Sequence, residues 1–327
     1  MRTLALAMCL LLGACGPATF SVTVGDRDNR LSEAVVLSDR RHSAKVALIE
    51  VRGLIVDGAT PGILGQGTNP VDDLVAELNK AADDSGVRAV VLRIDSPGGS
   101  VTASDVMYRE IQRFRSQTGK PVIASLATVA ASGGYYIALA ADRIVVEPTC
   151  ITGSIGVIFP TFNVSEAMQR WGILSRAVVS RPNKDIASPF EPIEEEHYRI
   201  IQSMVDEQYA RFRSLVVERR PGLPPERLDE ATDGRILSGL QALELRLADA
   251  PGGVREAFEA AKDAAGVSGA RLVRYHSPGQ RPRTPYAAAE MAGVESPGAA
   301  RVGLLNVDIP GIDRFRLEPG AYYLWMP

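Results

Sequence analysis

The stretch VRAVVLRIDSPGGS, residues 87–100, decides the fold of this 327-residue chain. Its first eight residues form an apolar run with the length and β-branched content of a buried strand, which we expect to end at Asp95. Residues 96–100 predict a sharp turn, and helical spacing returns from Val101 to Gln117. A buried strand that leads through a glycine-rich turn into a helix is the building unit of an α/β fold.

Similar units lie on both sides of this stretch. We expect strands at residues 46–51, 121–127, 143–146, 151–158 and 174–179, and helices at 71–84, 133–141, 164–171, from 193 onward and within 240–264. Their repetition predicts an α/β fold with mostly parallel strand pairing and a helical C-terminal extension.

The N-terminus has the pattern of a secretory signal. A basic start, Met1-Arg2-Thr3, precedes an apolar run that is too short to span a bilayer permanently. Small residues and then Cys15 follow, which resembles the lipobox of bacterial lipoproteins, where the cysteine is acylated. We expect a signal peptide at 1–14, a tether at 15–44 and an exported protein held at the membrane by a lipid on Cys15. The alternative is an ordinary signal peptide with a chance cysteine.

Composition narrows the class of partner. The apolar content of 46% and the charged content of 23% are ordinary for a globular protein, and the net charge of −3 without a basic cluster argues against nucleic acid. Removal of the signal and acylation of Cys15 would leave Cys150 as the one free thiol, so we expect no intrachain disulfide and a buried Cys150. We expect no metal and no cofactor.

Ser132 is the candidate nucleophile. It lies in a glycine-flanked turn after the strand at 121–127, and a serine hydroxyl reacts once a base takes its proton. Backbone N–H groups near Gly98 and Gly99 precede a helix, and Gly133 follows the nucleophile directly. These turns together offer two donors to the oxyanion of a tetrahedral intermediate.

Lys184 is the better candidate for the base. None of the three histidines follows a core strand: His42 lies in the tether, His197 in a helix expected to be exposed, and His276 near the tail. Lys184 follows the strand expected at 174–179. It can act only as a neutral amine, so its pKa must fall from about 10.4 in the active enzyme. Ser154 could accept or donate a hydrogen bond that orients this amine.

Four motifs carry a family resemblance. The segments DSPGG (95–99), ASGGYY (131–136), TGSIGV (152–157) and KDIASPF (184–190) resemble, in order and spacing, the bacterial signal peptide peptidase A family, also called protease IV, in its short single-core form. The resemblance covers about residues 45–265, the expected peptidase core, and leaves 266–327 as an extension of unknown role.

This resemblance implies a Clp/crotonase-like fold of repeated ββα units. It implies a dyad of Ser132 and Lys184 with Ser154 beside the lysine, and Gly99 and Gly133 as oxyanion donors. It also implies a ring-like homo-oligomer with active sites built across protomers, and peptide substrates such as signal peptides left in the membrane.

The chain departs from the family in two places. Short-form members are commonly held by a transmembrane segment, whereas this chain has the lipobox at Cys15. Residues beyond about 270 do not match the family core, and their apolar end, Ala321 to Pro327, is expected to dock on its own domain or on a neighbour. Because the short form can place its C-terminal segment in an active-site groove, Tyr322–Pro327 is a candidate for that position.

Two other functions remain open from the sequence. A crotonase-type acyl-CoA enzyme would use the same paired N–H groups, although export argues against an intracellular cofactor. A non-catalytic lipoprotein scaffold of the same fold is the second alternative.

Overall fold

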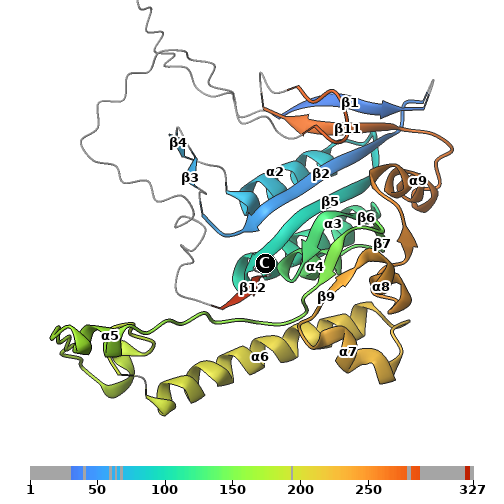
Figure 1. The fold of residues 1–327 in the computed structure, drawn as a ribbon. Coiled ribbons are helices and arrows are strands. Elements are labelled where there is room, and N and C mark those ends of the chain that lie inside the picture. The colour runs from blue at the N-terminus through green and yellow to red at the C-terminus, as the bar shows by residue number, and fades with distance from the viewer. Residues whose placement is uncertain are drawn as a thin grey trace, which may run out of the picture. The chain divides into compact units, whose positions relative to one another are not determined.

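The computed structural model describes residues 31–39, 42–58, 61–62, 65–66, 69–192, 194–277, 281–287 and 321–324. Within these residues, one sheet of ten strands forms the core, and the main run of neighbours is β1-β11-β2-β5-β6-β7-β10 (Figure 1). These strands are β1 Ser32–Ser38, β11 Arg271–His276, β2 Lys45–Ile55, β5 Val87–Ser100, β6 Val122–Ala131, β7 Arg143–Val146 and β10 Ala250–Pro251. Three short strands join at its margins: β8 Ile151–Gly153, β9 Ile236–Ser238 and β12 Tyr322–Leu324. A separate two-stranded sheet pairs β3 Pro61–Gly62 with β4 Gly65–Gln66.

The centre of the sheet is parallel, as predicted. Strand β5 pairs in parallel with β2 on one side and β6 on the other, and β6 pairs in parallel with β7. Val90 in β5 stands opposite Ala47 and Val122, and all three are buried. A strand covered on both faces reads as a continuous apolar run, which explains the pattern of residues 87–94.

Helices cover both faces of the sheet. On one face, alternate strand residues such as Ile49 and Leu92 share a core with α2 Pro70–Asp83, α3 Val101–Thr118 and α4 Gly133–Ala138. On the other face, residues such as Leu48 and Val91 pack against α9 Val254–Ala264. This alternation follows from the period of two along a strand. The remaining helical elements are α5 Ser165–Arg170, η1 Pro182–Asp185, α6 Glu195–Arg219, η2 Pro225–Arg227, α7 Leu228–Thr232 and α8 Gly239–Glu244.

The sheet extends past both ends of the predicted 45–265 core. Strand β1 comes from residues assigned to the tether, and β11 comes from residues assigned to the C-terminal extension. The two strands pair antiparallel with each other, and β11 pairs in parallel with β2. Their buried residues, Val36 and Leu272, join the core beneath α9.

Three local predictions differ from the structure. Residues 96–100, predicted as a turn, continue β5 because their main chain finds partners in β2, where Leu54 pairs with Gly98. The strand predicted at 151–158 is limited to β8. No strand forms at 174–179, and Leu174 and Val178 are 85% and 100% exposed. An apolar run becomes a strand only beside another strand, and this segment lies between α5 and η1.

Helix α6 links the core to a segment that we call the arm, residues 159–194. The C-terminal half of α6 packs on the core: Phe212 and Val216 are fully buried, and the Arg219 guanidinium donates to the carbonyls of Leu139 and Ala141. Figure 1 shows α5 beside the N-terminal end of α6, while α7 lies at the other end. The arm therefore lies by the N-terminal end of this long helix, and its other end continues from β8.

Candidate active site

Ser132 lies between β6 and α4 in a strained backbone conformation. Its φ of 53° and ψ of −114° are values that a non-glycine residue adopts at a cost of roughly 1–3 kcal/mol. Two hydrogen bonds hold this geometry: the Ser132 N–H donates to the Gly153 carbonyl at 2.8 Å, and the Ser132 carbonyl accepts from the Tyr136 N–H at 2.8 Å. The Oγ is buried and has no hydrogen-bond partner in the described part of the chain. Such an unpaired buried hydroxyl in a native fold points to a functional role.

Gly98 and Gly133 bring two stretches of backbone into close approach. Gly98 has a φ of 102°, and a Cβ there would lie 2.7 Å from the Gly133 nitrogen. A Cβ on Gly98 would also lie 2.0 Å from the Tyr323 carbonyl oxygen, and one on Gly133 would lie 3.0 Å from the same atom. Only glycine permits this spacing and this φ together. A peptide carbonyl therefore lies against both predicted oxyanion turns.

That carbonyl belongs to β12, the C-terminal strand of the same chain. Strand β12 pairs antiparallel with the end of β5, with Tyr323 opposite Gly99 (Figure 1). On its other side, Tyr322 exchanges two hydrogen bonds with Ile158, at 2.9 and 3.0 Å. The expectation that the C-terminal end lies in the groove is confirmed for Tyr322–Leu324, and residues 325–327 lie outside the described residues.

The register gives β12 the position of a peptide substrate. The Val101 N–H donates to the Ala321 carbonyl at 3.3 Å, so this pair is of the hydrogen-bonded kind. Along an antiparallel ladder, hydrogen-bonded pairs alternate with non-hydrogen-bonded pairs. Tyr323 and Gly99 lie two residues from Ala321 and Val101 on their strands, so they form the next hydrogen-bonded pair. The Gly99 N–H then faces the Tyr323 carbonyl, next to Gly133 and Ser132.

Ser154 follows Gly153, whose carbonyl accepts the hydrogen bond from the Ser132 N–H. Its backbone also has a positive φ, 50°, and its N–H donates to the Arg235 carbonyl at 2.7 Å. Ser154 lines a cavity of about 370 Å³, together with Leu324 of β12. Asp206 and Asp233 line the same cavity and give it an acidic wall. The cavity thus opens on the C-terminal side of the Tyr323 carbonyl.

Lys184 is not part of this cluster in the single chain. It lies in η1 on the arm and is exposed, and it does not follow a strand, because none forms at 174–179. Among the described residues, no hydrogen bond joins its amine to Ser132 or Ser154. The structure brings Ser132, Ser154, Gly99 and Gly133 together and leaves Lys184 apart from them.

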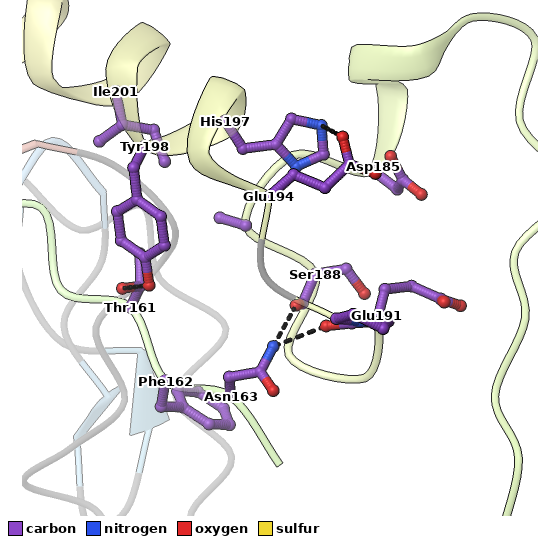
Figure 2. A pocket seen from close by; sticks show the side chains of 12 residues that line it. Thr161, Phe162, Asn163, Asp185, Ser188, Glu191, Glu194, His197, Tyr198 and Ile201 are labelled. Atoms are coloured by element: carbon purple, nitrogen blue, oxygen red, sulfur yellow. Dashed lines mark hydrogen bonds and ion pairs between the residues drawn. The ribbon is translucent and has the colours of Figure 1, made fainter. Parts of the chain in front are cut away.

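His197 is buried, contrary to the sequence prediction. It lines a cavity of about 150 Å³ within the arm, and its Nε2 lies 3.8 Å from the Glu194 carboxylate (Figure 2). The helix was expected to be exposed because charged residues surround this position, but α6 begins here and the arm folds over it. Ser132 does not line this cavity, so His197 is not its base.

The sequence also missed an aromatic cluster beside the groove. Tyr136 stacks on Tyr323 at 5.0 Å between ring centroids, and Phe212 contacts both rings. The Tyr136 ring, on the helix that follows Ser132, therefore contacts the strand in the groove. The apolar C-terminal run was the one signal in the sequence that pointed to such a contact. Cys150 is buried, as predicted, and burial raises the pKa of its thiol to about 12.

The described residues offer neither a metal-binding cluster nor a helix that could span a membrane. No group of three or more His, Cys, Asp or Glu side chains among them could hold a metal ion. No helix in these residues has both the length and the apolar content that a membrane span requires.

Known proteins match about two thirds to three quarters of the chain. The model of peptidase family S49 matches residues 114–268. A putative protease of Synechocystis is 34% identical over 68% of this chain and 75% of that protein, and a putative signal peptide peptidase SppA of Enterococcus faecium is 29% identical over 76% and 71%. Protease 4 of Haemophilus influenzae is 36% identical over 67% of this chain but 34% of its own length, as expected for a single-core form.

The α/β fold with repeated strand–helix units agrees with the Clp/crotonase-like architecture that the resemblance implied. With this fold, the buried Ser132 and the matches on both sides of it, the chain belongs to the signal peptide peptidase A family, peptidase family S49, and is a serine peptidase.

Proposed function

We propose that the chain is an endopeptidase with a Ser132–Lys184 dyad that hydrolyses apolar peptides at the membrane, and that the lysine comes from a neighbouring copy. One observation supports this most: a peptide carbonyl, that of Tyr323, lies against Gly98 and Gly133 beside the unpaired Ser132 hydroxyl. The family matches favour this reading over an acyl-CoA enzyme or a non-catalytic scaffold.

The reaction follows from the groups present. The neutral Lys184 amine takes the proton of the Ser132 Oγ, which attacks the substrate carbonyl carbon and forms a C–O bond. The N–H groups of Gly99 and Gly133 stabilise the oxyanion, each by about 3–4 kcal/mol of barrier. The lysine then protonates the leaving amine as the C–N bond breaks. Water, deprotonated by the same lysine, hydrolyses the acyl-enzyme.

The cavity beside Ser154 offers a route for the lysine. Its volume of about 370 Å³ is ample for an aminobutyl side chain, and Asp206 and Asp233 on its wall attract an ammonium group. Lys184 is exposed on the arm of its own chain, which supports its supply to the site by a second chain.

The arm has the surface of an assembly contact. Large apolar side chains there are exposed, including Phe162 at 73%, Trp171 at 84% and Leu174 at 85%. Exposed apolar residues gathered on one segment mark protein–protein contacts. They support a homo-oligomer in which the arm of each protomer reaches the next.

Placement outside the cytoplasm is part of the same proposal. The N-terminal pattern and Cys15 suit an exported lipoprotein, and signal peptides left in the membrane are substrates that such an enzyme would meet. Cys15 lies outside the described residues. Incorporation of labelled palmitate into the wild-type chain and not into Cys15→Ala tests the anchor, and equal incorporation in both would contradict it.

Complementation between two inactive variants tests the dyad. Ser132→Ala and Lys184→Ala should each abolish hydrolysis of a fluorogenic peptide by the purified full chain. Mixed and reassembled together, they should recover about one quarter of wild-type activity, because a quarter of randomly formed contacts join an intact serine to an intact lysine. Ser203→Ala, an exposed change on α6, is the matched control and should keep full activity. Full activity in either single variant would rule out the dyad, and no recovery in the mixture would rule out the shared site.

A further inference from the structure

Ser96 lies in β5 at a point where the sheet changes register on both sides. Along the ladder to β2, one residue, Gly53, stands against two residues of β5, Ser96 and Pro97. Towards β6, the register shifts between Ile94 and Ser96. A bulge of this kind interrupts the ladder, and Pro97 has no N–H to contribute. The main chain just before Gly99 therefore needs hydrogen bonds from another source.

The Ser96 side chain supplies two of these bonds. Its Oγ donates to the Gly53 carbonyl at 2.6 Å and accepts from the Gly98 N–H at 3.0 Å. Ser96 is fully buried, so water does not replace either bond. The hydroxyl uses its one donor and an acceptor position at once, and it ties β2 to the glycine turn of β5.

These bonds decide which N–H group of the turn faces the groove. The Gly98 N–H points to the Ser96 Oγ, inside the protein. The Gly99 N–H follows in the chain, and the pairing with β12 directs it to the Tyr323 carbonyl. A Cβ on Gly99 would lie 1.8 Å from the Ile55 carbonyl oxygen, so Gly99 is also held closely against β2. This geometry favours Gly99 over Gly98 as the oxyanion donor.

Ser96 also contacts the turn that carries the candidate nucleophile. It stands opposite Ala130 of β6, which precedes Ser132 by two residues. A Cβ on Gly134 would lie 2.7 Å from the Ser96 carbonyl oxygen, so the start of α4 packs directly on this peptide group. Ser96 thus meets β2, the glycine turn of β5 and the turn of Ser132.

From these contacts we infer that Ser96 is a positioning residue for the reaction, whose hydroxyl holds the Gly99 N–H where the oxyanion forms. The inference rests on the proposed function, which assigns the oxyanion to Gly99 and Gly133. It goes beyond that function because it assigns the geometry of the oxyanion site to a buried side chain. A bond to the oxyanion strengthens as charge develops in the transition state, so a displaced donor lowers kcat more than it changes KM.

Steady-state hydrolysis of a fluorogenic peptide by the full chain tests the inference. Ser96→Ala frees the Gly98 N–H and the end of β2, and kcat should fall by about 10- to 100-fold with KM within about threefold of wild type. Ser125→Ala is the matched control. Ser125 is also buried, but it pairs with Val145, which belongs to the core under α9 on the other face of the sheet. Its kcat should stay within about twofold of wild type.

A second variant and a pH profile separate positioning from general damage. Ser96→Cys keeps nearly the same volume with a weaker donor and acceptor, so its kcat should lie between those of Ser96→Ala and wild type. Neither variant changes a group that takes part in proton transfer. The plot of kcat against pH should therefore keep its shape while its height falls. A profile shifted along the pH axis would show that the base had moved and would overturn the inference.

The remaining outcomes also decide between the readings. Wild-type kcat in both Ser96 variants, an equal loss in Ser125→Ala, or a change in KM alone would each contradict the positioning role. Loss of the folded state in both Ser96 variants, measured by circular dichroism, would reduce the role of Ser96 to stability. Ser132→Ala separates the inference from the proposed function. Hydrolysis that survives Ser132→Ala would remove the proposed function, whereas its loss there together with full activity in Ser96→Ala would remove the inference alone.

Discussion

Ser132 and Lys184, the two residues of the proposed dyad, lie in opposite environments. Ser132 is 1% exposed, and its strained backbone is held by a hydrogen bond to the Gly153 carbonyl and another from the Tyr136 N–H. Lys184 is exposed on the arm, which also carries exposed apolar side chains. One chain therefore holds the candidate nucleophile and the predicted oxyanion turns together, whereas under the proposed function the base would come from another chain. The difference suggests that assembly, rather than folding, switches on the activity.

The largest expected effect comes from Lys184→Arg. Arginine keeps the charge and length of the side chain but does not give up its proton, so it cannot serve as a base. We expect kcat to fall by at least about a thousandfold, with the assembly unchanged. Peptide hydrolysis and light scattering on the same sample measure both. Activity within tenfold of wild type would show that Lys184 acts only as a charge.

The second test removes the apolar contact of the arm. The double change Leu174→Asp and Val178→Asp places charge on two exposed apolar positions, so it should leave the single chain folded and prevent assembly. Activity should fall by about a hundredfold or more, because few chains then receive a lysine. Light scattering gives the mass. Arg170→Asp, an exposed change on α5 that removes no apolar surface, is the control. A monomer with full activity would contradict the proposal that another chain supplies the base.

A third change disturbs the predicted oxyanion turns, which a single chain contains in full. Gly98→Ala places a Cβ 2.7 Å from the Gly133 nitrogen, at a φ of 102°. The two turns must move apart, and we expect kcat to fall by about a hundredfold, the effect of losing one oxyanion donor. Gly119→Ala, at an open helix end with φ 66°, carries backbone strain without a close neighbour and should retain activity. Similar losses in both variants would assign the effect to strain alone.

The smallest expected effect concerns acid stability where α6 meets the core. Burial would raise the pKa of Asp105, but hydrogen bonds from Arg211 and Tyr136 outweigh it and hold the pKa below its usual range. The carboxylate thus stabilises the fold above about pH 4, and this contribution is lost as the pH falls through the lowered pKa. Asp105→Asn should lower the Tm by about 2–5 °C at pH 7 and by less at pH 3. A difference that is the same at both pH values would exclude the ion pair as its cause.

The parts that the sequence predicted are those with a strong local signal. The apolar run at 87–94 indicated a buried strand because both of its faces are covered, and the glycines beside Ser132 indicated close backbone approach. The strand prediction at 174–179 was wrong because no strand among the described residues lies beside these apolar residues. Strands β1 and β11 were missed because they depend on each other across more than 230 residues, which local patterns do not record.

The site residues divide in the same way, into those with a local signal in the sequence and those that depend on distant segments. Ser132, Gly99, Gly133 and Ser154 were found from motifs that the chain folds into one place. Tyr136 and Phe212 were not assigned to the substrate groove, because their contact with Tyr323 joins three distant segments. The role of Lys184 stays a prediction, since its partner would lie on another molecule.

Under the proposed function, strand β12 would compete with substrate for the groove. A ligand on the same chain acts at an effective concentration that does not change with the dilution of the protein. A free peptide of equal affinity at micromolar concentration would then find few grooves empty. Such an enzyme ignores sparse peptides and responds when they accumulate locally, as peptides confined to a membrane surface do. The threshold would be set by the C-terminal sequence, so changes to Tyr322–Leu324 would tune it without touching the chemistry.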